Sequence, residues 1–381
     1  MKVYGGLSLE KDNLFFSFVL SKKKIIIPYV EGRQKISYSG KDLRDFIIAN
    51  IDEIDGYIRS QEKKHSFKMG DIFFKLPSSY AKIKILEDVV PLSFYKKLTL
   101  QDIVSIKKQM ENIALDLGDY CLHHIIMEYR IGEKIFYNSP IGEWAKKVFL
   151  KSMLITIPYD LYDTFRECFS NVNRKFSTFI HESIAEYSAL YRIPSKVHSF
   201  IIKIKEKATF LWCFLGRRLL FERVYEFGED NIIEEIAKRF RLPEYLAKNL
   251  VINYSSFDSL PHDKEISIKN GDRYFTIEAT IINSIVKEVI KNNMEEVIHD
   301  INKIRQQKDY TVSFVGELTE RDGFYTFMKG NFNLNIHSNS YFRERCPAAF
   351  GCVYYGKKML FEKDIQDSLW CRVVNVFREY F

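Results

Sequence analysis

The sequence predicts an α/β protein made of two lobes of similar design. The chain has 381 residues, which is more than one hydrophobic core usually supports, so we expect at least two subdomains. Pairs of β-rich segments followed by amphipathic helices occur twice, once on each side of residue 195. This repetition favours a duplicated architecture in which ligand or partner binding takes place between the lobes.

Composition restricts the function classes. The hydrophobic fraction of 46% and the charged fraction of 28% are those of a soluble globular protein. The net charge of +7 is evenly spread; it favours acidic partners or an anionic membrane surface and argues against nucleic acid. The six cysteines form no C-x-x-C pair, as is typical of a reducing compartment, so we expect neither a disulfide framework nor a zinc site.

The N-terminal segment shows no secretion signal. It reads MKVYGGLSL, without a charged stretch followed by an apolar one. No apolar run approaches the ~18 residues that a membrane-spanning helix needs. We therefore expect a cytoplasmic protein.

The first half of the chain predicts two blocks. β-rich runs over 14–20 and 24–30 indicate a hairpin, and apolar spacing over 43–58 indicates a helix with Ser39 as its cap. Strands over 71–77 and 80–86 follow, then a helix whose start combines Thr99 with Asp102, a variant of the capping box. The rest of this half predicts three strands over 121–158, a helix over 159–171 and a strand–helix unit that ends near Tyr191.

The second half repeats the pattern. Residues 199–221 predict two strands around the charged loop KIKEKAT, which spans 203–209. Two short amphipathic helices broken at Pro243 follow, then a long helix over 276–304 and a buried strand that leads into a glycine turn.

Conventional catalytic and metal motifs are missing. His123 and His124 lie on one predicted strand, so their side chains face opposite sides and do not share a metal. The segment HESIA, residues 181–185, lacks the second histidine of the H-E-x-x-H zinc motif. Cys346 and Cys352 flank a turn and are expected to be small buried residues. The sequence thus predicts no catalytic residue and no metal site.

The last fifteen residues, DSLWCRVVNVFREYF, have helical amphipathic spacing. Two interpretations follow from this spacing: an interfacial membrane anchor, or a terminal helix docked on the core. The residues assigned to the membrane contact are Leu369, Trp370, Val373, Val374, Phe377 and Phe381, with Arg372 and Arg378 beside them.

Several linked segments resemble FtsA, the actin-like bacterial cell-division family that tethers FtsZ filaments to the membrane. Residues 98–144 are similar to the FtsA-specific insert, with Glu128-Tyr129 ending a strand and Pro140-Ile141-Gly142 forming a turn. VSFVGELTERDG (312–323) is similar to the adenosine-side loop, and CPAAFGCVYYG (346–356) to the helix that follows it. The terminal amphipathic segment has the position of the family's membrane-targeting helix, which favours the anchor.

The resemblance implies a two-lobed, actin-like (ribonuclease-H-like) α/β fold with an FtsA-type SHS2 insert. The implied parts are a first lobe at 1–70, 153–195 and 346–366, the insert at 71–152, a second lobe at 196–223 and 278–345, its small subdomain at 224–277, and the membrane helix at 367–381. Self-association into protofilaments through the insert is also implied.

The nucleotide motifs depart from the family. Members open each lobe with an Asp-x-Gly turn, in which the carboxylate organises magnesium and glycine amides approach phosphates. Here the aspartate and glycine positions of the first turn fall on Gly6 and Ser8, and the aspartate position of the second turn falls on Lys203. The full set of degenerate nucleotide positions is Gly6, Ser8, Lys203, Lys205, Lys207, Thr209, Gly316 and Glu317. We expect no ATP or magnesium cofactor and no hydrolysis. Two interpretations of nucleotide binding remain: it is lost, or the lysines bind phosphate as point charges without magnesium.

The resemblance also implies the partners. The FtsZ tail docks on the small second-lobe subdomain of FtsA, and here a basic cluster of Lys238, Arg239, Arg241 and Lys248 is placed to receive an acidic tail. A solvated helix face explains these residues equally well. The sequence therefore predicts a non-hydrolysing scaffold that joins an FtsZ-like filament or other division protein to the inner face of the membrane. The alternatives are an active actin-like ATPase and an adaptor of type IV pilus assembly similar to PilM.

Overall fold

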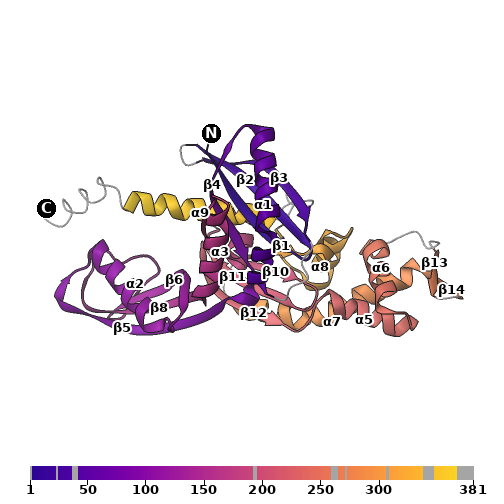
Figure 1. Cartoon of the computed structure of the whole chain (residues 1–381). Helices are drawn as coiled ribbons and strands as arrows, with labels where there is room; N and C mark the ends of the chain where they lie inside the picture. Colours follow the sequence, from indigo (N-terminus) through magenta and orange to yellow (C-terminus); the bar gives the residue numbers. More distant parts are fainter. Residues whose placement is uncertain are drawn as a thin grey trace. The chain divides into compact units, whose positions relative to one another are not determined.

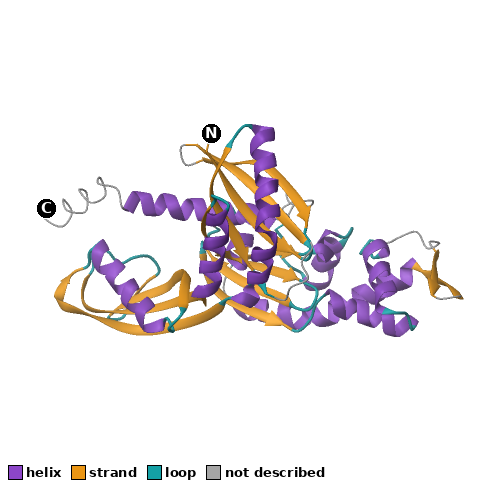
Figure 2. Ribbon diagram, viewed as in Figure 1, coloured by secondary structure: helices purple, strands orange, loops and turns teal. Residues whose placement is uncertain are grey.

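The computed structural model describes residues 2–22, 25–36, 42–191, 195–258, 265–270, 273–305, 309–337 and 347–366 (Figures 1 and 2). The chain divides into two compact units, one made of residues 1–192 and 344–381 and the other of residues 193–343. Residues 367–381, which carry the predicted membrane contact, lie outside the described part of the chain. Among the described helices, none is long and apolar enough to cross a bilayer.

The first unit contains a five-stranded sheet in the order β3-β2-β1-β4-β9. β1, β2 and β3 form an antiparallel meander, whereas β1, β4 and β9 run parallel, so the carboxyl ends of these three strands meet at one edge. The strands span Lys2–Glu10 (β1), Asn13–Lys22 (β2), Ile25–Lys35 (β3), Lys68–Leu76 (β4) and Lys175–His181 (β9).

Helices cover both faces of this sheet. Alternate β1 residues, Val3, Leu7 and Leu9, enter a core shared with α1 and α3. On the other face, α9 and α4 pack on the sheet and on each other. These helices span Leu43–His65 (α1), Tyr159–Asn171 (α3), Glu182–Leu190 (α4) and Pro347–Gln366 (α9).

Two glycines allow α9 to touch its neighbours backbone to backbone. A Cβ atom on Gly6 would lie 1.9 Å from the carbonyl oxygen of Ala349, and one on Gly351 would lie 1.8 Å from that of Ala185. Either side chain would force the elements apart. Gly6 is therefore needed for packing in the middle of β1.

An inserted sheet follows β4. It has the order β5-β8-β6-β7, all antiparallel, and α2 packs on one face over a separate apolar cluster. Its elements span Lys82–Lys97 (β5), Leu100–Ala114 (α2), Asp119–Ile131 (β6), Lys134–Phe136 (β7) and Trp144–Pro158 (β8). The predicted capping box of Thr99 and Asp102 is present. Because β4 belongs to the first sheet, the insert begins after Leu76 and not at residue 71; its assignment to the FtsA type stays a prediction.

The second unit repeats the connectivity of the first. Its sheet has the order β12-β11-β10-β15, with an antiparallel meander whose first strand pairs in parallel with β15. The strands span His198–Ile204 (β10), Thr209–Leu215 (β11), Arg218–Tyr225 (β12) and Tyr310–Val315 (β15), and a separate hairpin joins Glu265–Asn270 (β13) to Arg273–Glu278 (β14). The helices span Glu229–Phe240 (α5), Glu244–Tyr254 (α6), Ala279–Arg305 (α7), Glu317–Glu320 (η2) and Phe324–Phe332 (α8).

Two local predictions were wrong. Asp42, not Ser39, caps α1, because its carboxylate accepts a hydrogen bond from the amide of Arg44 at 3.1 Å; Ser39 lies outside the described residues. The long helix begins at Ala279, since the three residues before it belong to β14. Proline does separate α5 from α6, with Pro243 as the N-cap of α6.

Candidate functional site

The carboxyl edge of the first sheet gathers charged side chains. In open α/β sheets, ligands bind outside the carboxyl ends of the parallel strands. β1 ends at Glu10, Lys75 is the penultimate residue of β4, and Glu182 follows β9 directly as the first residue of α4. Sheet topology alone therefore brings these three residues, which are far apart in the sequence, to one edge.

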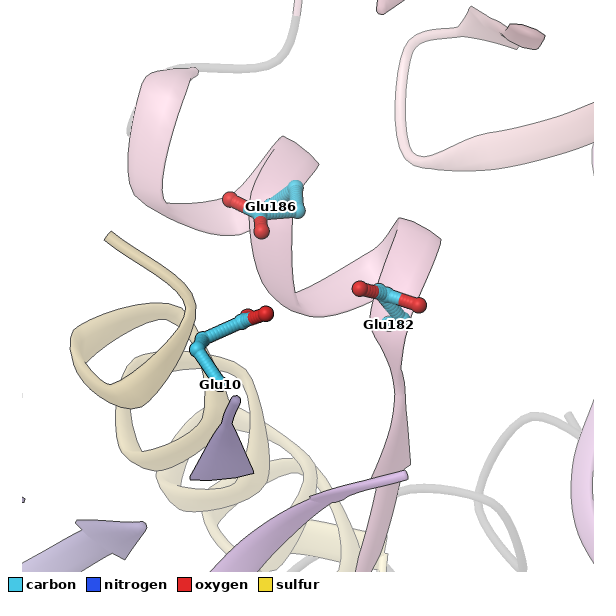
Figure 3. A group of neighbouring side chains, drawn as sticks. All are labelled: Glu10, Glu182 and Glu186. Carbon is cyan, nitrogen blue, oxygen red and sulfur yellow. The ribbon is translucent and has the colours of Figure 1, made fainter. Parts of the chain in front are cut away.

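Three carboxylates face a common space at this edge. Figure 3 shows Glu10 at the tip of its strand, opposite Glu182 and Glu186 on the first two turns of α4. Their nearest carboxylate oxygens all lie within 4.8 Å of one another. Both α4 carboxylates are fully buried. Such a set of oxygens is the kind that hard divalent cations prefer.

A lysine supplies positive charge to this carboxylate group. The side chain of Lys75 is 1% exposed, its ammonium forms an ion pair with Glu10, and its nitrogen lies 3.3 Å from Oε1 of Glu182. The other oxygen of Glu182 accepts a hydrogen bond from the amide of Ser78 at 3.1 Å. The carboxylates thus suit a divalent ion, but an ammonium fixed by the fold already neutralises part of the charge that would attract one.

A pair of histidines lies beside this edge. The backbone N–H of His181 donates to Nε2 of His123 at 3.1 Å, and Nδ1 of His181 lies 2.7 Å from Oγ of Ser183. Burial, together with the nearby His181, lowers the pKa of His123 to about 3, so its ring is neutral. His124 has a different partner, because its Nδ1 lies 3.0 Å from Glu111 on α2.

The first-lobe positions assigned by the resemblance lie away from the turn. Gly6 pairs with Ser17 in the middle of β1, and Ser8 is a buried residue of the same strand. The turn itself is formed by Lys11, with a φ of 51°, and Asp12. The carboxylate at the end of the strand is therefore that of Glu10, a residue that the resemblance did not assign to the site.

The second-lobe turn spans residues 205–208, between β10 and β11. Lys203 is buried in the penultimate position of β10. The amide of Lys205 donates to the carbonyl of Ala208 at 3.0 Å, and its ammonium lies 4.7 Å from the centroid of the Phe210 ring. Thr209 donates its hydroxyl to the carbonyl of Phe227 at 2.8 Å, so this threonine is held by the fold. Lys207 is an exposed residue of the turn.

Neighbouring backbone closes over this turn. The amides of Glu229 and Asp230, at the start of α5, donate to the carbonyls of Lys205 and Glu206 at 2.9 and 2.8 Å. Amides at a helix start lack partners within the helix, and in phosphate sites they point at the anion. Here the two amides are bound to protein carbonyls instead.

Two glycines make this closure possible. A Cβ atom on Gly228 would lie 2.2 Å from the carbonyl oxygen of Glu206, and one on Gly316 would lie 2.3 Å from that of Ile204. Gly316 also has a φ of 130°, which other residues rarely adopt. Glu317 follows it as the first residue of η2. All second-lobe positions assigned by the resemblance therefore surround one tightly packed turn.

The predicted partner cluster lies on the small helices of the second unit. Lys238, Arg239 and Arg241 are exposed at the end of α5, and Lys248 is exposed on α6. Arg239 is bound to Glu235 at 2.6 Å and to Glu288 of α7 at 2.9 Å. Lys238 and Arg239 line a polar groove of about 450 Å³ between α5 and α7.

Sequence reasoning missed the residues of the carboxylate edge. Lys75 was visible as the only charged residue of the apolar run IFFKL, and Glu182 as an acidic residue directly after a predicted strand. Glu186 follows four residues later, on the same face of a helix. Each signal is common alone, and only the sheet topology joins them.

Sequence comparison finds no matching family model and no matching curated protein. The structure is similar to that of a PilM–PilN type IV pilus biogenesis complex, with a TM-score of 0.60 and 12% identity over 93% of this chain and 98% of that chain. It is also similar to diol dehydratase-reactivating factor in nucleotide-free form, with a TM-score of 0.54 and 7% identity over 94% and 100% of the two chains. Another similar structure is that of the ethanolamine utilization protein EutJ from Carboxydothermus hydrogenoformans, with a TM-score of 0.52 and 10% identity over 92% of this chain and 89% of that chain. The predicted actin-like, two-lobed α/β fold is confirmed; at these identities the likeness concerns the fold alone.

Proposed function

We propose that this actin-like protein is a scaffold that links a filament or assembly protein to the inner face of a membrane without hydrolysing ATP. We infer the lack of ATP hydrolysis from the position of Lys75, whose ammonium lies between the carboxylates of Glu10 and Glu182. Nucleotide hydrolysis in such a fold needs magnesium held near the phosphates and free backbone amides around them. The Lys75 ammonium among the carboxylates disfavours the binding of magnesium there, because it already neutralises part of their negative charge.

The second lobe supports the same conclusion. The amides at the start of α5 are bound to the carbonyls of Lys205 and Glu206, so they are not directed at a phosphate. Lys203 stands where the resemblance expects the magnesium-organising aspartate. The test is nucleotide affinity and phosphate release with magnesium: we expect neither, whereas micromolar binding with turnover would support the alternative of an active actin-like ATPase.

For the partner, we propose an FtsZ-like acidic tail that binds near Lys238 and Lys248. Both side chains are exposed, and neither forms an ion pair within the part of the chain that the structure describes, so both can bind carboxylates of a partner. Arg239 is a poorer candidate because Glu235 and Glu288 already neutralise it. Titration of a fluorescent FtsZ-tail peptide tests this: Lys238→Glu with Lys248→Glu should abolish binding, and an unchanged affinity would contradict it.

A second candidate partner comes from the similarity to the PilM–PilN structure, at a TM-score of 0.60. In that reading, the partner is a PilN-like protein of a pilus assembly. Titration of a PilN peptide in parallel with the FtsZ-tail peptide separates the two candidates, because the Lys238 and Lys248 substitutions should affect only the acidic tail.

For the membrane, we propose that the terminal segment 367–381 inserts its apolar face. Its support is the spacing of Trp370, Val373 and Phe377. Co-sedimentation with liposomes should decrease for a chain that ends at Asp364 and for the substitutions Trp370→Glu and Phe377→Glu. Equal sedimentation of the full chain, the shortened chain and the substituted chain would contradict a membrane role of this segment.

A further inference from the structure

One end of the inserted sheet exposes large apolar side chains. The exposed fractions are 63% for Phe94, 63% for Tyr95, 48% for Ile141 and 56% for Trp144. We call these four residues the insert tip. Single exposed apolar residues are ordinary, but a contiguous group with three aromatic rings marks a contact surface.

Backbone pairing makes the insert tip continuous. Leu98 donates to the carbonyl of Glu143, and Gly142 donates to the carbonyl of Leu98, both at 2.8 Å. These bonds hold the loop that carries Ile141 beside the end of β5. The rings of Tyr95 and Trp144 stack across the strands, with centroids 5.5 Å apart.

A bulge in β5 turns the aromatic residues outward. Pro91 pairs with Lys147 and Lys96 pairs with Ala145, so residues 92–95 of β5 lie opposite the single residue 146 of β8. Bulges re-aim side chains and interrupt pairing. The apolar core below does not use Phe94 or Tyr95, so packing of the insert does not explain why they are aromatic.

The charged residues around the insert tip are mostly positive. Residues 94–98 and 134–147 contain five lysines and one glutamate. Lys97, Lys146 and Lys147 are exposed. Two of the five lysines are less available to an anionic partner, because Lys96 binds Asp102 at 2.5 Å and Lys134 lies 3.9 Å from Glu143.

We propose that the insert tip is a membrane contact of its own, which places Phe94, Tyr95 and Trp144 in the interfacial layer of an anionic bilayer. Tryptophan and tyrosine concentrate at membrane–water interfaces, where a ring has one apolar and one wet side. Lysines on long flexible stems reach lipid phosphates while the rings insert. This contact is independent of the terminal segment 367–381 and of the proposed partner.

Vesicle sedimentation tests the proposal in the full chain. Trp370→Glu with Phe377→Glu first removes the proposed terminal contact. In that background, the protein should still sediment with phosphatidylcholine vesicles that contain phosphatidylglycerol, less so at high salt, and not with phosphatidylcholine alone. Phe94→Ser with Tyr95→Ser and Trp144→Ser should lower this binding at least tenfold.

The matched control replaces two exposed aromatic residues of the second unit, Tyr245 and Tyr274, which are 63% and 73% exposed. Serine at these positions should leave vesicle binding unchanged. The substituted sites of the tip variant and of the control variant are all exposed, so the thermal unfolding midpoint of both should equal that of the Trp370→Glu, Phe377→Glu background chain. The proposal would be overturned if the tip variant bound vesicles as well as the background chain does. It would also be overturned if the tip variant and the control variant lost the same amount of binding.

Fluorescence gives a second, direct readout. In a Trp370→Phe chain the remaining tryptophans are Trp144 and the fully buried Trp212. Lipids with brominated acyl chains should quench Trp144 when the protein binds the vesicles. A vesicle-bound protein with unquenched Trp144 would show that the insert tip faces away from the bilayer and would overturn the proposal. Both readouts are separate from nucleotide and peptide binding, so this inference and the proposed function can fail independently.

Discussion

The ammonium nitrogen of Lys75 lies 3.3 Å from a carboxylate oxygen of Glu182, and both side chains are closed off from solvent. Lys75 also pairs with Glu10, so one lysine of β4 ties the end of β1 to the start of α4. Two charges are buried together here at a high desolvation cost, which their mutual attraction and the amide of Ser78 offset. Lys75 thus joins strands β1 and β4 to helix α4 at the edge where ligands bind in this architecture.

Substitution of Lys75 by methionine should therefore destabilise the protein strongly. The variant keeps the length of the side chain but leaves the buried carboxylate of Glu182 and the partly exposed carboxylate of Glu10 without their cation. Loss of one partner of a buried ion pair typically costs about 3–5 kcal/mol. Urea unfolding measures the change.

The control for this experiment is Lys151→Met. Lys151 pairs with Glu87 on the inserted sheet, where the side chains are 30% and 47% exposed. Loss of this pair should cost less than about 1 kcal/mol. In addition, Glu182→Gln should recover part of the loss in the Lys75→Met chain, because it removes one uncompensated charge. Similar effects of the two lysine substitutions would mean that the Lys75 pair is not important for stability.

Much of the fold follows from local sequence signals. The predicted helix over 159–171 coincides with α3, and Thr99 and Asp102 form the predicted capping box. These features depend on residues close in sequence. The predicted N-cap of α1 was wrong because serine and aspartate are both favourable N-cap residues, and the local sequence does not decide between Ser39 and Asp42.

Gly228→Ala should destabilise the second lobe. The new methyl group would lie 2.2 Å from the carbonyl oxygen of Glu206 and would push the β10–β11 turn away from α5. Overpacking of this kind costs about 1–3 kcal/mol. Chemical denaturation checks the value.

Gly56→Ala is the matched control. Gly56 lies inside α1, and a Cβ atom there would have no neighbour within 4 Å. Alanine should therefore stabilise this helix by about 0.5–1 kcal/mol. If both glycine variants shifted stability in the same direction, close packing of the turn would not be the cause.

The stability of the protein should fall as the pH drops below 6.5, in part because of His123. Burial holds the pKa of this ring at about 3 in the folded chain, against an ordinary value of 6.5. Between these values the unfolded chain binds a proton that the folded chain does not, so unfolding is favoured as pH decreases. One such proton corresponds to about 1.4 kcal/mol per pH unit.

His123→Gln isolates this contribution. The glutamine oxygen can accept the hydrogen bond from the amide of His181 but does not titrate. Between pH 6 and 5, the wild-type chain should lose about 1 kcal/mol more than the variant, because acidic groups affect both chains alike. Parallel pH profiles would contradict the assignment of a neutral, buried His123.

The candidate site was less predictable than the fold. The resemblance placed the first phosphate turn at Gly6 and Ser8, but both residues lie within β1, where the close approach of Ala349 requires glycine at position 6. The carboxylate edge depends on the parallel pairing of β1, β4 and β9. No local sequence pattern predicts that pairing, so only the three-dimensional structure shows that Glu10 and Glu182 lie close together.

Phosphate release with saturating ATP and magnesium tests the central claim most directly. The full chain should release no phosphate above the rate in buffer, because Lys75 lies among the carboxylates and the amides at the start of α5 are bound to the second-lobe turn. Release that rises with protein concentration and is abolished by Glu182→Gln would contradict a non-hydrolysing scaffold.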